Sequence, residues 1–308
     1  MAILEVNGLS IAFTQYNKGL RQTNIQAVKN FSITLNEGEI LAVVGSSGSG
    51  KSLLAHAILG LLPANAQMNG ELVYQNHPLT SKRQAKLRGK EIVLIPQSTN
   101  YLDPLMKVGK QVRLSGMDKK QRKIRQKQLF KQYNLAEKVD HMFPYELSGG
   151  MARRVLLSMS TMNKPKVIIA DEPTPGLDEN IMQEALNQFR QLKKLGCAMM
   201  FITHDIEAAL QVADRVAVFY AGTTIEIANV DDFKGKGENL RHPYTKALWN
   251  ALPQNGFTPI VGSQPALGEK IIGCPFKDRC SLKTDECEKN LPELQSIRDG
   301  EVRCFHAN

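Results

Sequence analysis

The sequence predicts an α/β fold in which a mostly parallel β-sheet is covered by helices on both faces. Short apolar segments recur along the chain, and stretches with helical character alternate with them, as in parallel sheets built from strand–helix–strand units. One apolar segment is followed by a glycine- and serine-rich turn and then by a helix. The chain has 308 residues, of which 42% are hydrophobic and 22% charged, so it can bury a sizeable core.

The first expected strand of this sheet covers residues 39–44, a short apolar segment typical of a buried strand. The helix after the glycine-rich turn is expected over residues 52–59, with its end near Gly60 and Pro63. Further strands and helices then alternate along the chain. The strands are expected at residues 92–95, 167–170, 198–203 and 215–220, and the helices at 181–195 and 205–212.

Two regions differ in composition from this core. Residues 99–163 are rich in Lys, Gln, Leu and Met and contain no clear strand, so we expect a helical insertion between two core strands. Near residues 234–237 the sequence Lys-Gly-Lys-Gly is a plausible linker. We therefore expect a main domain over residues 1–235 and a C-terminal extension over residues 236–308.

The formal net charge is +9, and part of the excess lies in the basic run at residues 119–127. The simplest interpretation of this run is a solvated helix face, and the alternative is contact with a partner or with anionic lipid. No window reaches the ~18–20 apolar residues of a membrane span, and the N-terminus lacks a basic segment followed by an apolar run. We therefore expect a soluble, cytoplasmic chain with a membrane role only through another subunit.

The glycine-rich turn after the first strand fits the phosphate-loop pattern G-x-x-x-x-G-K-[ST] in full. Its residues are Gly45, Ser46, Ser47, Gly48, Ser49, Gly50, Lys51 and Ser52. Glycines let the backbone wrap closely, so that successive N–H groups and the start of the following helix face the phosphates. Lys51 is expected to reach the β- and γ-phosphates, and the Ser52 hydroxyl to bind Mg²⁺.

Two carboxylates, Asp171 and Glu172, directly follow the strand at residues 167–170. In a parallel sheet this end of the strand lies beside the phosphate loop. Asp171 is the expected Mg²⁺ partner, and Glu172 is suited to orient or deprotonate the attacking water.

A second phosphate-binding helix start is indicated by Ser148, Gly149 and Gly150, which precede an apolar helix. By itself this segment reads as an ordinary helix cap. One nucleotide bound to one chain needs only one phosphate-binding helix start. A second one is expected if two chains form a dimer and each contributes to the other's nucleotide site.

Taken together, these motifs resemble those of ABC-type ATPases. Phosphate loop, Gln97 after a strand, Leu-Ser-Gly-Gly, Asp-Glu, Leu177-Asp178 and Thr203-His204-Asp205 occur in the family's order, over about residues 3–230. The resemblance implies a phosphate-loop nucleoside triphosphatase fold that binds ATP and Mg²⁺. It also implies a head-to-tail dimer in which Ser148, Gly149 and Gly150 complete the ATP site of the other subunit.

The same resemblance implies roles for further residues. Gln97 would sense Mg²⁺ or the attacking water and link the site to the membrane subunits through the helical insertion. His204 would contact the γ-phosphate and the water, and Asp178 would couple the two sites. Phe13 is our choice for the aromatic residue that stacks on adenine, with Tyr16 second.

The sequence departs from the family's usual pattern at three places. Ser46 stands where relatives usually carry Glu, which we expect to have a small effect because that side chain is not a principal phosphate contact. Met151 ends the Ser-Gly-Gly segment in place of Gln, as in the branch that imports peptides and nickel. Pro175-Gly176 replaces the usual Ser-Ala or Thr-Ala before Leu177. The catalytic set is complete, so we expect active hydrolysis.

The C-terminal extension resembles that of oligopeptide and dipeptide importer ATPases. The resemblance lies in the His-Pro-Tyr-Thr segment at residues 242–245 and in Cys274, Cys280, Cys287 and Cys304. Four thiolates are suited to hold a [4Fe–4S] cluster or a tetrahedral Zn²⁺. The spacing lacks the paired knuckles of zinc ribbons, and relatives with this tail are associated with an iron–sulfur cluster, so we favour the cluster and a structural role.

The resemblance as a whole predicts an importer ATPase at the cytoplasmic face of the cell (inner) membrane. Its expected partners are a second, related ATPase subunit, two membrane-spanning permease subunits and an extracytoplasmic substrate-binding protein. The cysteine tail favours di- or oligopeptide cargo, and nickel or a metal chelate is the close alternative. A soluble ABC ATPase acting on nucleic acid or ribosomes is disfavoured because the chain has neither two ATPase units nor a long coiled coil. A metal–sulfur redox module is disfavoured by the complete hydrolytic series.

Overall fold

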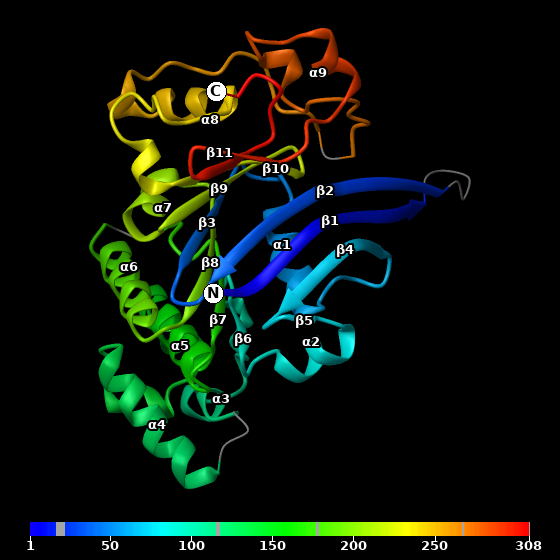
Figure 1. The fold of residues 1–308 in the computed structure, drawn as a ribbon. Coiled ribbons are helices and arrows are strands. Elements are labelled where there is room, and N and C mark those ends of the chain that lie inside the picture. The colour runs from blue at the N-terminus through cyan, green and yellow to red at the C-terminus, as the bar shows by residue number, and fades with distance from the viewer. Residues whose placement is uncertain (17–21, 115–117, 177–178, 267, 308) are drawn as a thin grey trace.

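The computed structural model describes residues 1–16, 22–114, 118–176, 179–266 and 268–307. Its centre is an eight-stranded sheet in the order β11-β12-β10-β9-β3-β8-β7-β6 (Figure 1). Five of these strands lie where the sequence predicted strands. They are β3 (Ile40–Val44), β6 (Ile92–Ile95), β7 (Val167–Asp171), β8 (Ala198–Thr203) and β9 (Arg215–Tyr220).

The predicted parallel arrangement holds for the centre of this sheet. Strand β3 pairs in parallel with β8 and β9, and β7 pairs in parallel with β6 and β8. The outer strands on one side are antiparallel: β10 (Thr223–Asn229), β12 (Gly300–Val302) and β11 (Gln295–Ile297). The sheet is therefore mixed, and its parallel part is the part that carries the predicted motifs.

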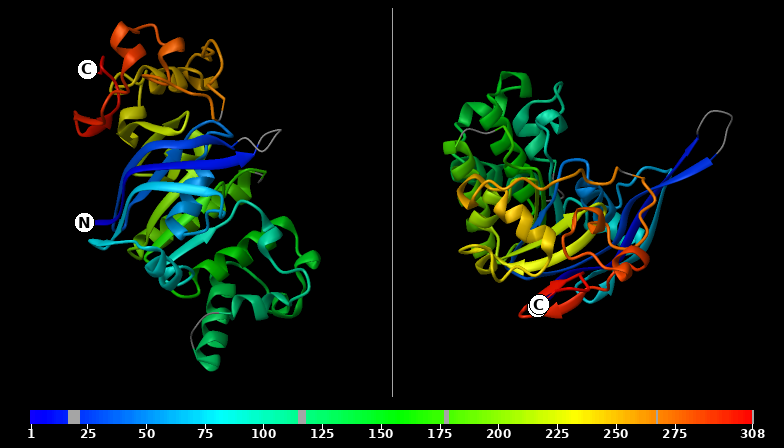
Figure 2. Two further views of the ribbon diagram at one scale, coloured as in Figure 1. Left: turned by 90° about the vertical axis from the view of Figure 1, so that its right-hand side faces the viewer. Right: turned by 90° about the horizontal axis from the view of Figure 1, so that it is seen from above.

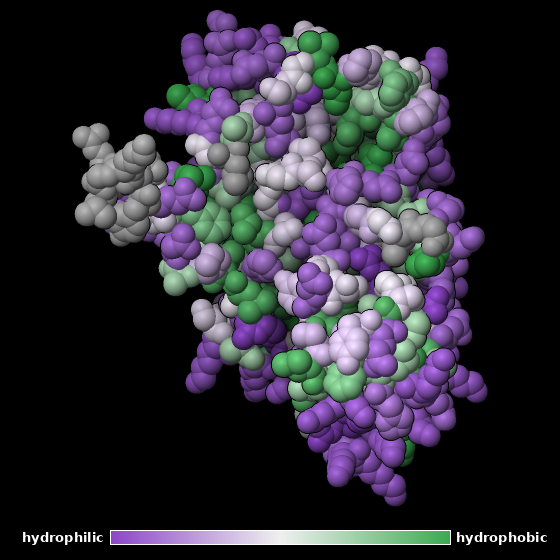
Figure 3. All heavy atoms as spheres, turned by 180° about the vertical axis from the view of Figure 1, so that it is seen from behind, coloured by the Kyte–Doolittle hydropathy of each residue, from purple (hydrophilic) through white to green (hydrophobic). Residues whose placement is uncertain are grey.

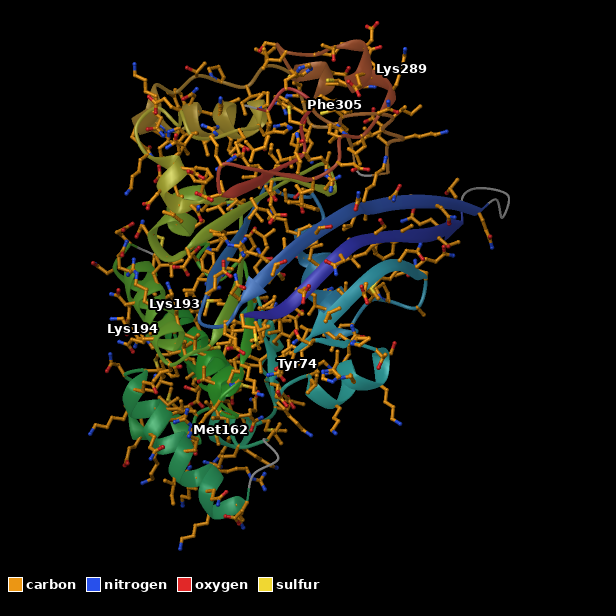
Figure 4. All side chains as sticks on the ribbon, in the orientation of Figure 1. Tyr74, Met162, Lys193, Lys194, Lys289 and Phe305 are labelled. Atoms are coloured by element: carbon orange, nitrogen blue, oxygen red, sulfur yellow. The ribbon has the colours of Figure 1, made fainter. Side chains whose placement is uncertain are left out.

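A second, fully antiparallel sheet was not predicted from the sequence. Its order is β2-β1-β4-β5, with β1 at Ala2–Tyr16, β2 at Gln22–Asn36, β4 at Ala66–Tyr74 and β5 at His77–Pro78. Helix α2 (Ser81–Leu87) lies at its edge, where the Arg83 guanidinium carbon lies 5.9 Å from the centre of the Tyr74 ring; Tyr74 is labelled in Figure 4. The expectation of one mostly parallel sheet is thus corrected to two sheets.

Helix α1 (Lys51–Leu59) lies between the two sheets and shares one core with both. Its buried Leu54 and Ile58 pack in the same cluster as Val6 of β1 and Leu41 of β3. The opposite face of the main sheet is covered by α6 (Glu179–Lys194) and α7 (Ile206–Val212). The C-terminal end of α6 is marked in Figure 4 by Lys193 and Lys194. The central strands are therefore covered on both faces, as predicted.

The insertion predicted at residues 99–163 is helical, and its described residues contain no strand. It comprises α3 (Val108–Val112), α4 (Lys119–Gln132), α5 (Gly149–Thr161) and three short 3₁₀ turns, Thr99–Tyr101, Glu137–His141 and Pro144–Glu146. It occupies the end of the molecule opposite the C-terminal extension (Figure 2). The lysines of α4 are exposed, and α4 lies at the hydrophilic lower end of Figure 3; this exposure is compatible with both interpretations of the basic run.

The C-terminal extension is continuous with the main sheet through the pairing of β12 with β10. It also contains α8 (Pro243–Asn250) and α9 (Asp285–Lys289), and Phe305 lies in this part of the molecule (Figure 4). Arg241 is buried at the junction, with Nη1 2.9 Å from Asp232 Oδ2 and 3.5 Å from Glu226 Oε1. The predicted domain boundary near residue 235 thus falls just before a buried ionic anchor. No helix in the described ranges is long and apolar enough to span a membrane.

Candidate functional site

The phosphate-loop segment connects β3 to α1, and glycines are required at several of its positions. At Gly45 a Cβ would lie 2.3 Å from the Phe219 carbonyl oxygen on β9. Gly50 has a φ of 100° and packs against the Ala27 carbonyl oxygen, a backbone conformation that glycine adopts without steric cost. The loop is therefore fixed by its fit between β9 and β2.

Lys51 is almost fully buried in this loop. Its ammonium group donates hydrogen bonds to the Gly45 and Ser46 carbonyl oxygens at 2.8 and 2.9 Å and lies 3.8 Å from Glu172 Oε1. Burial lowers the pKa of Lys51, while the charges of Glu172 and Asp171 act in the opposite direction. The amine is thus held at the mouth of the loop, where a triphosphate would bind.

The hydroxyl of Ser52 and the carboxylate of Asp171 meet at the edge of the sheet. Ser52 Oγ donates a hydrogen bond to Asp171 Oδ1 at 3.1 Å, across 119 residues of sequence. Burial raises the pKa of Asp171, and the adjacent charge of Glu172 raises it further, whereas the Ser52 hydrogen bond lowers it. Two hard oxygen donors next to a phosphate loop fit Mg²⁺, and the role of these residues as Mg²⁺ ligands stays a prediction.

Glu172 and His204 form a second pair beside the loop. His204 Nδ1 lies 2.9 Å from Glu172 Oε2, and Glu172 has a left-handed backbone with a φ of 46°. Both side chains line a cleft of about 310 Å³ together with Gln97, Lys51 and Ser52. The sequence could bring these residues together only by motif order; the structure does so because β6, β7 and β8 end at the same edge.

Gln97 lies between this cleft and the helical insertion. It follows β6, lines the cleft, and its backbone oxygen accepts a hydrogen bond from Arg153 of α5 at 3.0 Å. A shift of α5 would therefore reach the cleft through this bond.

The Ser-Gly-Gly segment lies outside the cleft of its own chain. Ser148 caps α5 by accepting a hydrogen bond from the Met151 amide at 3.3 Å, and neither glycine lines the cleft around Lys51. A Cβ at Gly149 would meet no atom within 4 Å. The start of α5 is thus an open surface within a single chain.

Three of the predicted residues are placed differently or lie outside the description. Phe13 is half-buried on β1, packs against the core between the sheets, and lines neither cavity beside the phosphate loop. Tyr16 ends β1, and its side chain is outside the described part, as is the whole of Asp178. The adenine-stacking role of Phe13 therefore stays a prediction, and its packed position gives it no support.

A second cavity beside the loop was not foreseen from the sequence. It measures about 300 Å³ and shares Ser47 and Gly48 with the first cleft. One wall belongs to the loop and β2, and the other to C-terminal residues, among them Gln264. Gln264 carries no motif, and only the fold brings it to the loop.

The four cysteines of the extension gather in one region, but their side chains form no metal site. The Cys274 amide donates a hydrogen bond to the Cys287 carbonyl oxygen at 2.8 Å. Burial raises the pKa of Cys274 to about 11, and the neighbouring Cys287, Cys304 and Cys280 act in the same direction. Within the described residues, no group of three or more His, Cys, Asp or Glu side chains is arranged to hold a metal ion. The predicted metal-binding character of the extension is therefore not supported by the side-chain geometry.

The fold and the cleft define a phosphate-loop ATPase, and comparison with known proteins narrows this class. A family model for ABC transporters matches residues 28–175, and one for the C-terminal region of oligopeptide/dipeptide transporters matches residues 225–287. The chain belongs to the ATP-binding subunits of ABC transporters, in the oligopeptide/dipeptide family.

Its similarity to relatives in this family extends over almost the whole chain. It is 35% identical to the dipeptide transport ATP-binding protein DppD of Bacillus subtilis, over 98% of this chain and 94% of that protein. It is 33% identical to the oligopeptide transport ATP-binding protein OppD of Escherichia coli, over 99% and 93%. Among solved structures, a dimeric bacterial ABC transporter cassette matches 74% of this chain and 99% of its own, with 26% identity and a TM-score of 0.63.

Proposed function

We propose that this chain hydrolyses ATP to drive the uptake of di- or oligopeptides across the cytoplasmic membrane. The observation that carries the proposal is the cleft in which Lys51, the Ser52–Asp171 pair and the Glu172–His204 pair surround one phosphate loop. The peptide cargo is supported by the similarity of almost the whole chain to DppD and OppD, which are described as dipeptide and oligopeptide transport ATP-binding proteins. Nickel or a metal chelate remains the alternative cargo.

The residues of the cleft divide the work of phosphoryl transfer to water. Lys51 and the loop amides bind the β- and γ-phosphates. Ser52 and Asp171 would hold Mg²⁺, which when bound neutralises charge on the phosphate oxygens. Glu172 accepts the proton of the attacking water, and His204 holds the carboxylate in place through their 2.9 Å contact.

In this proposal, each complete ATP site is formed by two ATPase subunits. The open start of α5, with Ser148, Gly149 and Gly150, would face the ATP bound to the partner ATPase, which is a related chain. Two permease subunits would sit above the dimer, with Gln97 and α5 relaying closure to them. A substrate-binding protein outside the membrane would deliver the peptide. The chain itself would lie at the cytoplasmic face of the membrane.

The test reconstitutes the whole transporter in lipid vesicles and supplies ATP on the side of the membrane where this subunit lies. We expect ATP-dependent accumulation of a labelled dipeptide or oligopeptide, and its loss in Glu172→Gln together with steady-state hydrolysis. ATP-dependent accumulation of Ni²⁺ without peptide would replace the peptide by the alternative cargo. Unchanged ATP turnover in Glu172→Gln would overturn the catalytic assignment.

We also propose that Cys274, Cys280, Cys287 and Cys304 hold a structural [4Fe–4S] cluster, with Zn²⁺ as the alternative. The proposal rests on the chemistry of four thiolates and on the proximity of the other three cysteines to Cys274, whose pKa is raised first by burial and further by these neighbouring thiols. Its formation would require the side chains to turn from their present arrangement. Iron and sulfide analysis of anaerobically purified chain is the test, and zinc without iron or sulfide would refute the cluster.

A further inference from the structure

The C-terminal extension reaches back across the molecule to the phosphate loop. The contact is made by residues that we call the extension strap: Gln264, Pro265, Ala266, Gly268, Glu269 and Ile271. These residues form one wall of the second cavity, and the opposite wall comprises Gln26, Ala27 and loop residues 46–49. The cavity thus exists only where the extension and the nucleotide-binding domain meet.

The extension strap is fixed to this domain by three contacts. Ser46 Oγ donates a hydrogen bond to Gln264 Oε1 at 2.5 Å. Lys29 of β2 donates to the Ile271 carbonyl oxygen at 3.4 Å. Gly268 lies so close to β2 that a Cβ would stand 2.6 Å from Ile25 Cγ2. The strap is therefore seated on β2 and the loop.

The second cavity adjoins the cleft that holds the catalytic groups. The two cavities share Ser47 and Gly48, and Lys51, Ser52, Glu172 and His204 all lie in the first. A triphosphate with its γ-phosphate at these groups must place its nucleoside elsewhere along the loop. The two volumes, about 300 and 310 Å³, together fall within the usual size of small-molecule sites, roughly 300–1,000 Å³.

Gln264 is the strap residue best suited to contact a nucleotide. It is half-buried, and its amide oxygen is engaged by Ser46. Among the described residues, the amide nitrogen of Gln264 has no hydrogen-bond acceptor. The other polar side chain of the strap, the carboxylate of Glu269, already accepts a hydrogen bond from the Ala266 amide at 3.0 Å. An amide nitrogen donates hydrogen bonds, and the ribose, which directly follows the α-phosphate, offers oxygen acceptors.

We propose that the extension strap forms the outer wall of the nucleoside part of the ATP site, and that the amide of Gln264 binds the ribose hydroxyls. This inference rests on the proposed ATPase function and adds a binding residue from the far end of the chain. The Ser46 hydroxyl, at a position where ABC ATPases usually carry Glu, holds the Gln264 side chain in the required orientation. ATP binding is thereby coupled to the seating of the extension.

The test compares two probes on the full-length chain: ATP with Mg²⁺, and inorganic tripolyphosphate with Mg²⁺, which lacks the nucleoside. In Gln264→Ala we expect the dissociation constant for ATP to rise roughly five- to tenfold, the size of one lost hydrogen bond. The dissociation constant for tripolyphosphate should not change. Wild-type chain should bind 2′,3′-dideoxy-ATP more weakly than ATP, and Gln264→Ala should bind the two equally.

The matched control is Gln254→Ala, which removes an exposed glutamine elsewhere in the same extension and should change neither constant. The inference is overturned if Gln264→Ala weakens both probes equally, because the residue would then act only through the loop. It is also overturned if both constants stay at the wild-type value. Failure of the wild-type chain to bind ATP would instead overturn the proposed ATPase function.

Discussion

His204 and Glu172 stand 2.9 Å apart, although they follow different strands and are 32 residues apart in sequence. The pair exists because β7 and β8 are parallel neighbours, so that the residues after them meet at one edge of the sheet. Glu172 is buried while His204 remains half-exposed. The carboxylate is thus held by a side chain that itself faces the open cleft.

Replacing His204 by Ala should lower ATP turnover by about a hundredfold or more, with little change in the KM for ATP. The reason is that Glu172 would lose the contact that orients it toward water, while the phosphate-binding groups stay intact. Steady-state hydrolysis in the assembled transporter measures both constants. His77→Ala, at an exposed histidine on β5, is the control, and equal turnover in the two variants would contradict the assignment.

The Mg²⁺ dependence should respond to the Ser52–Asp171 pair. Ser52→Ala removes one oxygen of this pair, and the concentration of Mg²⁺ for half-maximal hydrolysis should rise by about tenfold or more. Titrating Mg²⁺ at saturating ATP gives this value. Ser81→Ala, at an exposed serine at the start of α2, should leave it unchanged. A wild-type Mg²⁺ requirement in Ser52→Ala would exclude Ser52 as a ligand.

Gly149→Ala should separate the stability of the chain from its activity. A Cβ there meets no atom within 4 Å in the single chain, so the free energy of unfolding should stay level or rise by about 0.5 kcal/mol. If Gly149 packs against ATP on the partner subunit, the added methyl group should lower hydrolysis roughly tenfold or more. Thermal unfolding and turnover are measured on the same preparation. Normal turnover would show that the start of α5 contacts no nucleotide.

His242 should make the chain sensitive to acid. The residue is fully buried, its Nε2 has no hydrogen-bond partner among the described residues, and burial lowers its pKa to about 3. In the unfolded chain His242 binds a proton near pH 6.5, whereas in the folded chain it does so only near pH 3. The stability that the neutral His242 contributes is therefore fully present above pH 6.5 and is lost as the pH falls toward 3. Between pH 7 and 5 the loss from this group should be about 2 kcal/mol.

Unfolding measured across this pH range checks the effect of His242. The variant His242→Asn keeps a side-chain acceptor for the Tyr244 amide at the start of α8 but removes the titrating group. Its stability should therefore depend less steeply on pH than that of the wild type. Equal slopes in the two proteins would show that other groups cause the acid sensitivity.

Local sequence determined the elements that carry chemistry. The phosphate loop requires glycines at fixed positions, and the short apolar run at residues 167–170 forms most of the buried strand β7. Motif order then predicted that Lys51, Asp171, Glu172 and His204 share a site. The individual elements could be predicted because strand, turn and helix signals act over a few residues.

The sequence alone determined the parallel core of the sheet, the ATP-binding motifs and the family to which the chain belongs. Only the tertiary structure decided that β1, β2 and β4 form a second sheet, that the half-buried Phe13 packs against the core, and that Gln264 meets Ser46 across 218 residues. These outcomes depend on strand pairing and packing between distant segments. No local pattern encodes them, because their free energy comes from surfaces that meet only after the chain has folded.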